Sequence, residues 1–239
     1  KGAKYMKSYT IHLIRHGISQ GNLLGQYIGV TDSPLSKEGK EQLKQLAEQN
    51  SYPYAQAYYT SPLSRCVDSL KLIYPNAEPI VVEGFKECNF GKWEGKSAKD
   101  LEHDPDFIQW MESGSTMSPP GGEDGGHFMQ RVCMEFETFV ERMMRTGETS
   151  AVLMVHGGTI MSILSAYGLP RAPFYDWMVE PGHGYSLRIT PGLWMRSMVA
   201  EVYDTIPPRE QQQNREHTVI DYAREAANRA FGDKEETES

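Results

Sequence analysis

The run TIHLIRHG occupies residues 10–17 and sets the expectation for the architecture of the chain. Its first part, Thr10 to Ile14, is mostly apolar, which is typical of a buried parallel strand. A second apolar run, AVLMV at residues 151–155, also ends in histidine and glycine, at His156-Gly157-Gly158. Ligands of open α/β sheets bind beyond the carboxyl ends of the strands, so we expect both histidines to meet there. The glycines would let the main chain approach a ligand closely and present N–H groups to an anion.

Helical and strand patterns alternate around these two runs. Ser36 is a good N-cap for a helix over 37–49, and Ser61-Pro62 is expected to start a helix ending near Tyr74. A long helix is expected after Gly121-Gly122-Glu123, up to about Met144, and a shorter helix over 159–167. Further strands are expected at residues 56–60, 79–82, 185–189 and 195–203. The alternation predicts an α/β fold with a mostly parallel sheet.

The length of 239 residues suits one large domain, here placed at residues 6–204. Residues 83–120 are the least regular stretch, with a helix expected at 106–112, and we interpret about 96–121 as a cap insertion. Residues 1–5 are interpreted as a cloning remnant ahead of a natural start at Met6.

A polar extension follows at residues 205–239, and its end is expected to be disordered. Five residues inside this extension share one helical face: Val219, Ala223, Ala226, Ala227 and Ala230. A helix with this face would dock on the body of the protein or on a second copy, so a homodimer is one of the two outcomes.

Composition excludes several classes of protein. The net charge of −8 disfavours a nucleic-acid-binding surface, which needs a basic footprint. The mean hydropathy is −0.54 and no run of about 18 apolar residues occurs, so we expect no membrane span and no leader peptide. The three cysteines, Cys66, Cys88 and Cys133, lack CxxC spacing. They predict reduced thiols in a cytoplasmic protein, without a zinc site or a disulfide framework.

Arg65 stands out on electrostatic grounds. It falls in the first turn of an expected helix, where a cation opposes the helix dipole, and a bound phosphate would offset that cost. Four other histidines are interpreted as structural or surface residues: His12, His103, His127 and His217.

Five motifs follow one another along the chain. They are Arg15-His16-Gly17-x-Ser19-x-x-Asn22, Ser61-Pro62-Leu63-x-Arg65, Glu87-x-x-Phe90-Gly91-x-Trp93-Glu94-Gly95, Gly121-Gly122-Glu123 and Val155-His156-Gly157-Gly158. In that order they resemble the histidine phosphatase superfamily, over about Tyr9 to Asp204. The resemblance implies the phosphoglycerate mutase-like fold, a three-layer α/β/α sandwich with a small cap insertion.

The resemblance also implies a phosphohistidine mechanism on a small phosphorylated substrate, with inorganic phosphate as product and neither metal nor cofactor. His16 is similar to the family's nucleophile and Glu87 to its proton donor. Arg15, Arg65, His156, Asn22 and Gly157 correspond to its phosphate-binding positions. The attacking nitrogen of His16 must be neutral, and a backbone carbonyl is expected to hold the other nitrogen as a donor. We expect the two arginines to depress the pKa of Glu87 in the free enzyme.

The phosphatase branch, with alpha-ribazole phosphatase-like and broad-specificity members, fits better than the mutases. Mutases of this family carry arginines after the acid glutamate, and no arginine lies between Glu87 and Glu123. Without a second phosphate or carboxylate site, phosphohistidine should pass its phosphoryl group to water. The alternatives are mutase-type phosphoryl transfer and a non-catalytic relative that binds phosphorylated ligands or proteins.

Several residues depart from the family pattern or leave their roles open. Ile28 stands where many members carry a polar phosphate contact, so the pocket has one contact fewer or a more apolar wall. His183 could reach the mouth of the pocket. The cap offers Phe107, Trp110, Met111 and Met117, with Lys96 and Lys99 at its start. These apolar side chains favour a partly apolar alcohol as leaving group, or else they only pack the cap onto the body.

Overall fold

A seven-stranded sheet crosses the described part of the chain, residues 7–113 and 117–208, in this computed structural model. The order across the sheet is β3-β2-β4-β1-β6-β7-β5. The strands are β1 (Tyr9–Arg15), β2 (Ala57–Thr60), β3 (Pro79–Val81), β4 (Ser150–Val155), β5 (Gly168–Leu169), β6 (Gly184–Ile189) and β7 (Ala200–Ile206). Only β6 runs against its neighbours, pairing antiparallel with both β1 and β7. The mostly parallel sheet is therefore confirmed.

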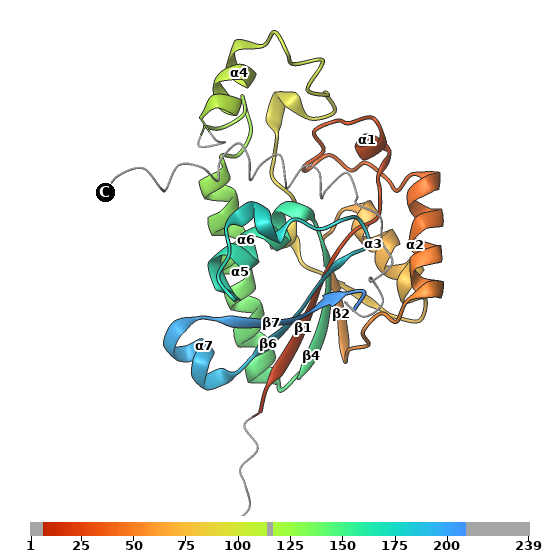
Figure 1. Cartoon of the computed structure of the whole chain (residues 1–239), viewed down its shortest axis with the longest axis vertical. Helices are drawn as coiled ribbons and strands as arrows, with labels where there is room; N and C mark the ends of the chain where they lie inside the picture. The colour runs from red at the N-terminus through yellow and green to blue at the C-terminus, as the bar shows by residue number, and fades with distance from the viewer. Residues whose placement is uncertain (1–6, 114–116, 209–239) are drawn as a thin grey trace, which may run out of the picture.

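Helices cover both faces of the sheet, which confirms the three-layer arrangement. They are α1 (Gln20–Leu23), α2 (Lys37–Gln49), α3 (Ser64–Ile73), α4 (Pro105–Glu112), α5 (Gly125–Thr146), α6 (Gly157–Tyr167) and α7 (Pro191–Ser197). Three short 3₁₀ helices are η1 (Glu83–Phe85), η2 (Gly91–Trp93) and η3 (Phe174–Trp177). Helices α2 and α3 lie on one side of the sheet, and α5 and α6 lie on the other (Figure 1).

The alternation of side chains along the central strands builds two cores. Ile11 and Leu13 of β1 point into the larger core with α5 and α6, whereas Ile14 joins the core with α2 and α3. One face of α5 is buried against the sheet, formed by Phe128, Val132, Phe136, Phe139, Val140 and Met143. Both faces of β1 and β4 are covered, which is why most of their residues are apolar.

Two sequence-based expectations about local structure are wrong. Helix α3 begins at Ser64 with Leu63 at its N-cap, two residues later than expected from the Ser61-Pro62 pair. The main chain at Ser61 still follows the sheet, because its N–H donates to the carbonyl of Met154. Residues 195–199 do not extend the last strand: α7 occupies Pro191–Ser197, with Pro191 in its first turn. The strand β7 begins at Ala200 and reaches Ile206, two residues past the expected domain end.

The described part of the cap segment, residues 96–113 and 117–121, lies above the sheet (Figure 1). It contributes Leu101, Phe107 and Trp110 to a third and smaller apolar cluster. Asp104 caps α4, accepting from the N–H groups of Asp106 and Phe107. The cluster buries Trp93, Leu101 and Phe107, and three partly buried rings pack against it: Tyr27, Phe90 and Trp110. The cap is therefore fastened to the loop after α1 by aromatic packing.

Residues 1–5 and the expected helix of the C-terminal extension, with His217, lie outside the described residues. Their interpretation stays a prediction, as do the domain limits.

Candidate active site

Two neighbouring strands bring the two sequence-predicted histidines together. Strands β1 and β4 pair in parallel with Arg15 opposite Val155, so His16 and His156 leave the sheet at the same level. The N–H of His16 donates to the carbonyl of Val155 at 3.0 Å. The two rings are buried, with an edge-on contact between centroids 5.2 Å apart. The expected meeting of the two histidines is confirmed.

His16 is held in one tautomer. Its Nδ1 lies 2.6 Å from the carbonyl oxygen of Gly17, so Nδ1 carries the proton and Nε2 keeps its lone pair. This confirms the expected backbone partner. Burial, and then the nearby Arg65 and Arg15, hold the pKa of His16 well below its usual value. The ring is therefore neutral near pH 7, as a nucleophile requires.

Arg65 is almost fully buried beside this ring and is fixed by three hydrogen bonds. Its Nε donates to Nε2 of His16 at 3.3 Å, and its Nη1 and Nη2 donate to the carbonyls of Thr31 and Gly29 at 2.9 and 2.6 Å. Ser69 supports the same corner, accepting from the N–H of Gly17. A rigid guanidinium against the histidine is well placed to bind phosphate oxygens.

Arg15 is the last residue of β1 and directly precedes His16. Its Nη1 donates to the carbonyl of Val179 at 2.6 Å, whereas its buried Nε has no hydrogen-bond partner among the described residues. Burial lowers the pKa of this guanidinium, and Glu87 and Glu180 oppose that shift. A buried N–H that lacks an acceptor is costly, and an anion in the pocket would supply one.

His156 is fully buried, and its partners differ from the predicted ones. Its Nε2 lies 2.7 Å from the hydroxyl of Ser61, and the thiol of Cys66 packs 3.6 Å from the same nitrogen. Burial, followed by His16, Arg65 and Arg15, lowers its pKa well below the usual value. In this arrangement Ser61 takes the nitrogen that we expected to face a substrate oxygen.

Glu87 lies against the first turn of α6. Its two carboxylate oxygens accept from the N–H groups of Cys88 and Gly158 at 3.0 and 3.1 Å. Burial raises its pKa above the ordinary value, although the two N–H donors, Arg65 and Arg15 pull the other way. Our expectation of a depressed pKa in the free protein is wrong, because desolvation outweighs the arginines.

Three further positions were singled out from the sequence: Asn22, Ile28 and Gly157. Asn22 closes α1 on itself, its side-chain oxygen accepting from the N–H of Ser19 at 3.1 Å. Asn22 and Ile28 both line a cavity of about 360 Å³ next to Glu87, so Ile28 adds an apolar wall there. Gly157 begins α6, and a side chain there would touch Nε of Arg15 at an ordinary 3.4 Å.

Two charged residues organise the site without having been predicted from the sequence. Glu94 accepts from the N–H groups of the loop whose carbonyls hold Arg65. Arg131 donates to the carboxylate of Glu123 and to the carbonyls of Gly84, Lys86 and Glu87. The motif glutamates themselves were the available signal, because a carboxylate in a glycine-rich turn tends to accept from main-chain N–H groups.

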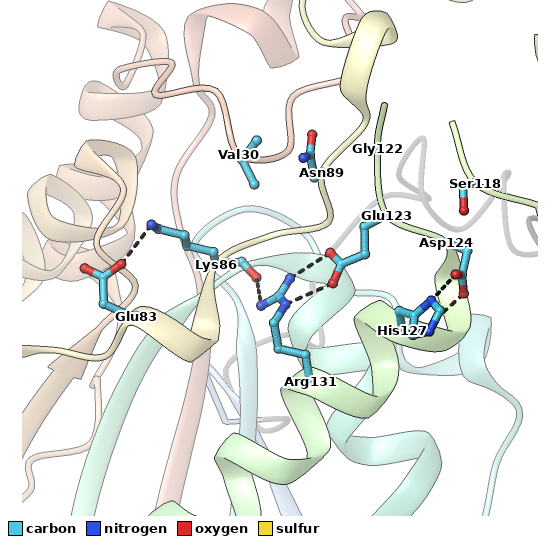
Figure 2. A pocket seen from close by; sticks show the side chains of 10 residues that line it. All are labelled: Val30, Glu83, Lys86, Asn89, Ser118, Gly122, Glu123, Asp124, His127 and Arg131. Atoms are coloured by element: carbon cyan, nitrogen blue, oxygen red, sulfur yellow. Dashed lines mark hydrogen bonds and ion pairs between the residues drawn. The ribbon is translucent and has the colours of Figure 1, made fainter. Parts of the chain in front are cut away.

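Arg131 also forms the wall of a second cavity, of about 540 Å³, that shares Glu123 with the first. Figure 2 shows its charged side chains pairing with one another: Glu83 with Lys86, Glu123 with Arg131, and Asp124 with His127.

Two other histidines, His12 and His183, and the thiols of Cys66 and Cys88 are buried or partly buried. His12 is buried with Nδ1 2.9 Å from the hydroxyl of Ser186, and its pKa falls to about 4 because of burial. The ring of His183 is buried beside the carbonyl of Pro181, at 3.1 Å from Nδ1. Burial raises the pKa of the Cys66 thiol, and raises that of Cys88 to about 12.

The fold and these contacts define an α/β protein in which two buried histidines and two buried arginines lie together at the carboxyl ends of β1 and β4. A model of the histidine phosphatase superfamily (branch 1) matches residues 11–201. The chain therefore belongs to the histidine phosphatase superfamily, in agreement with the order of its motifs.

Relatives include both phosphatases and mutases. Phosphoserine phosphatase 1 of Hydrogenobacter thermophilus is 30% identical over 147 residues, covering 60% of this chain and 68% of that protein. The 2,3-bisphosphoglycerate-dependent phosphoglycerate mutase of Rhizobium etli is 30% identical over 177 residues, covering 70% and 83%. The solved structure of a putative alpha-ribazole-5'-P phosphatase from Escherichia coli superimposes with a TM-score of 0.68 at 23% identity, covering 82% of this chain and 94% of that chain. That superposition shows the shared fold.

No helix within residues 7–113 and 117–208 is long and apolar enough to cross a membrane. In the same ranges, no group of three or more His, Cys, Asp or Glu is placed to hold a metal ion.

Proposed function

We propose that this protein is a metal-independent phosphomonoester hydrolase that works through a phosphohistidine on His16, with Glu87 as general acid and base. The observation that carries the proposal is the state of His16: a buried, neutral ring whose Nδ1 is tied to Gly17 and whose Nε2 faces Arg65. The same residues would act on a small phosphorylated substrate and release inorganic phosphate.

In the first step Nε2 of His16 attacks phosphorus and the ester P–O bond breaks. Arg15 and Arg65 neutralise the charge on the phosphoryl oxygens, the main requirement of phosphoryl transfer. Glu87 donates its proton to the leaving oxygen, which becomes the product alcohol. The raised pKa of Glu87 favours the protonated form that this step needs.

In the second step water replaces the alcohol. The Glu87 carboxylate takes a proton from the attacking water, the P–N bond breaks, and phosphate leaves with His16 neutral again. Gly157 and Gly158 start α6 beside these groups, so its N-terminus adds a favourable dipole for the phosphoryl group.

Mutase-type transfer is the second candidate, favoured by the match to a mutase of similar identity. A mutase must hold a second anionic group of its substrate. Within the described ranges, no lysine or arginine is among the residues that line the cavity beside Glu87. This observation supports water rather than a second phosphoglycerate as the acceptor.

The test is phosphate release from a panel of phosphomonoesters with EDTA present, beside 3-phosphoglycerate isomerisation. His16→Ala should lose release by 10³-fold or more, on the order of a removed nucleophile. Glu87→Gln should slow alkyl esters by about 10²- to 10⁴-fold, and His103→Ala, changed at an exposed ring, serves as the matched control. Isomerisation without release would support the mutase. Tight phosphate binding with neither activity would support a non-catalytic phospho-ligand-binding relative.

A further inference from the structure

The cavity beside Glu87 is bounded by the cap on one side and by helices of the body on the other. Trp110 of α4 and Tyr27 of the loop after α1 form the cap side, with ring centroids 6.1 Å apart. Phe128 of α5 and Phe174 of η3 come from the body. Its volume of about 360 Å³ falls within the range of small-molecule sites.

Not every cap side chain named from the sequence reaches this cavity. Trp110 lines it, but Phe107 packs inside the cap cluster, and Met111 and Met117 are exposed. Helix η3 adds a further wall, with Phe174 and the half-exposed Tyr175, which the sequence had not predicted. The apolar lining therefore comes from six separate parts of the chain, since Phe90 and Met161 of α6 also contribute to it.

The ionisable side chains that line the cavity are acidic. Among the residues that the structure describes, its carboxylates are Glu87 and Glu123, and no lysine, arginine or histidine lines it. The Glu123 carboxylate is matched by Arg131, at 2.9 and 3.0 Å. A second anionic group on a substrate would meet no unpaired cation among these lining residues, so its desolvation would go uncompensated, which costs affinity.

We propose that this cavity binds the leaving alcohol and selects uncharged aromatic or apolar alcohols, with Trp110 and Tyr175 as specificity-determining residues. The inference rests on the proposed function, because the cavity adjoins the proposed acid Glu87. It excludes leaving groups that carry a carboxylate or a second phosphate from the preferred substrates.

The experiment compares primary alkyl phosphates, so that the intrinsic reactivity of the leaving oxygen stays similar. The panel is 2-phenylethyl phosphate, ethyl phosphate, phosphoserine and 3-phosphoglycerate, with 4-nitrophenyl phosphate as a reference for activity. Burial of one aromatic ring should raise kcat/KM for 2-phenylethyl phosphate by about 50-fold over the two anionic substrates.

Two variants test the named residues. Trp110→Ala should lower kcat/KM for 2-phenylethyl phosphate by about tenfold or more and leave ethyl phosphate within about twofold. Met111→Ala, one position along the same helix and exposed, is the matched control. Tyr175→Lys places a cation at the rim and should raise turnover of 3-phosphoglycerate by about fivefold at low salt, an effect that Tyr203→Lys should lack.

The outcomes separate the two proposals. If 4-nitrophenyl phosphate is hydrolysed but 3-phosphoglycerate or phosphoserine is preferred, the cavity inference is wrong and the proposed function stands. An equal loss on both alkyl esters in Trp110→Ala would assign that ring to cap packing only. If no ester is hydrolysed, the proposed function fails and the inference fails with it.

A second and independent feature is the carboxylate of Glu94. Its oxygens accept from four main-chain N–H groups, those of Gly29, Val30, Thr31 and Phe90, at 2.9 to 3.2 Å. One carboxylate thus gathers three consecutive peptide units of one loop, a concentration of bonds typical of an organising residue.

The same loop holds the phosphate clamp. The carbonyls of Gly29 and Thr31 accept from the two terminal nitrogens of Arg65, whose Nε reaches His16. A side chain at Gly29 would collide with the carbonyl of Cys88 at 1.6 Å, so the loop also presses on the residue after Glu87. We infer that Glu94 is a positioning residue that sets Arg65 against His16 through this loop.

Glu94→Gln keeps the shape but replaces one acceptor oxygen by an NH₂ group, so the loop should loosen. We expect the KM for phosphomonoesters and the inhibition constant of inorganic phosphate to rise about tenfold or more, with a smaller loss in kcat. Glu102→Gln, at an exposed carboxylate, is the control. Glu94→Asp keeps the charge with a shorter side chain, so its KM and inhibition constant should lie between those of Glu94→Gln and of the control.

A readout that general destabilisation would not move is the titration of His16, followed by NMR of ¹⁵N-labelled histidine. Arg65 helps to hold the pKa of His16 down, so this pKa should rise toward the usual value in Glu94→Gln. Unchanged phosphate inhibition and an unchanged His16 titration in the folded variants would overturn the inference. A lower melting temperature alone would show that Glu94 only stabilises the fold.

Discussion

Gly158 offers the sharpest test of the acid's position. A Cβ on this residue would lie 2.5 Å from a carboxylate oxygen of Glu87 and 3.1 Å from the ring of Phe128. Real Cβ atoms essentially never come within 3.0 Å of another atom, so Gly158→Ala must displace the carboxylate by roughly half an ångström or more. The bond from the Gly158 N–H, now 3.1 Å, orients the same carboxylate and would be disturbed too.

The expected cost follows from the role proposed for Glu87. A misplacement on this scale costs about 10²-fold in rate, or about 2.7 kcal/mol of barrier, and loss of the acid is bounded at about 10⁴-fold. The loss should appear in kcat for ethyl phosphate and nearly vanish for 4-nitrophenyl phosphate, whose leaving group needs little protonation. Stability should not suffer equally, because alanine is the better helix former.

The assay is steady-state phosphate release by Gly158→Ala on both esters, with thermal unfolding measured beside it. Gly192→Ala is the matched control, because no atom lies within 4 Å of a side chain placed there. An equal loss on both esters would refute the reasoning, since it would place the damage in phosphate binding or folding. No loss on either ester would show that the carboxylate tolerates the displacement.

Three further predictions concern protonation. Because burial lowers the pKa of His16 and raises that of Glu87, kcat/KM for alkyl esters should fall as pH rises through the pKa of Glu87. On the acid side kcat/KM should stay constant until well below pH 6.5, because His16 remains neutral there. Glu87→Gln should abolish the fall at higher pH. His12 has its pKa lowered to about 4, so its contribution to stability is complete above about pH 6.5 and declines by up to about 3 kcal/mol toward pH 4. Urea unfolding across this range should show a shallower decline in His12→Gln. The thiols of Cys66 and Cys88 should resist a thiol reagent at pH 8 in the native protein and react in denaturant, and fast native labelling would contradict their raised pKa values.

Most of the fold could be predicted from the sequence, because the local hydrophobic patterns agree with the positions of the strands and helices in the sheet and its layers. Buried runs such as 10–14 and 151–155 are strands with both faces covered, and Ser36 caps its helix by accepting from the N–H of Gly39. The start of α3 was predicted wrongly, and a tertiary hydrogen bond lies at that point. The N–H of Ser61 continues the sheet to Met154, and this bond delays the start of α3.

For the candidate site, too, some properties were predictable from the sequence and others were not. His16, Arg65 and Glu87 were identified from motifs, because the residue types that suit phosphoryl transfer are few and recur in order. The direction of the Glu87 pKa was predicted wrongly, since charges are visible in a sequence and burial is not. Desolvation is the sum over every neighbour that excludes water, and those neighbours come from distant segments.

By itself, then, the sequence determined the alternating elements, the strand ends that carry His16 and His156, and the inventory of charged groups. Only the tertiary structure decided how those groups are held: Glu94 reaching three N–H groups of a loop some sixty residues away, and Arg131 fixing the chain before Glu87. Hydrogen bonds depend on distances of tenths of an ångström and on direction. Such distances arise when packed layers bring remote segments together, and no local propensity encodes them.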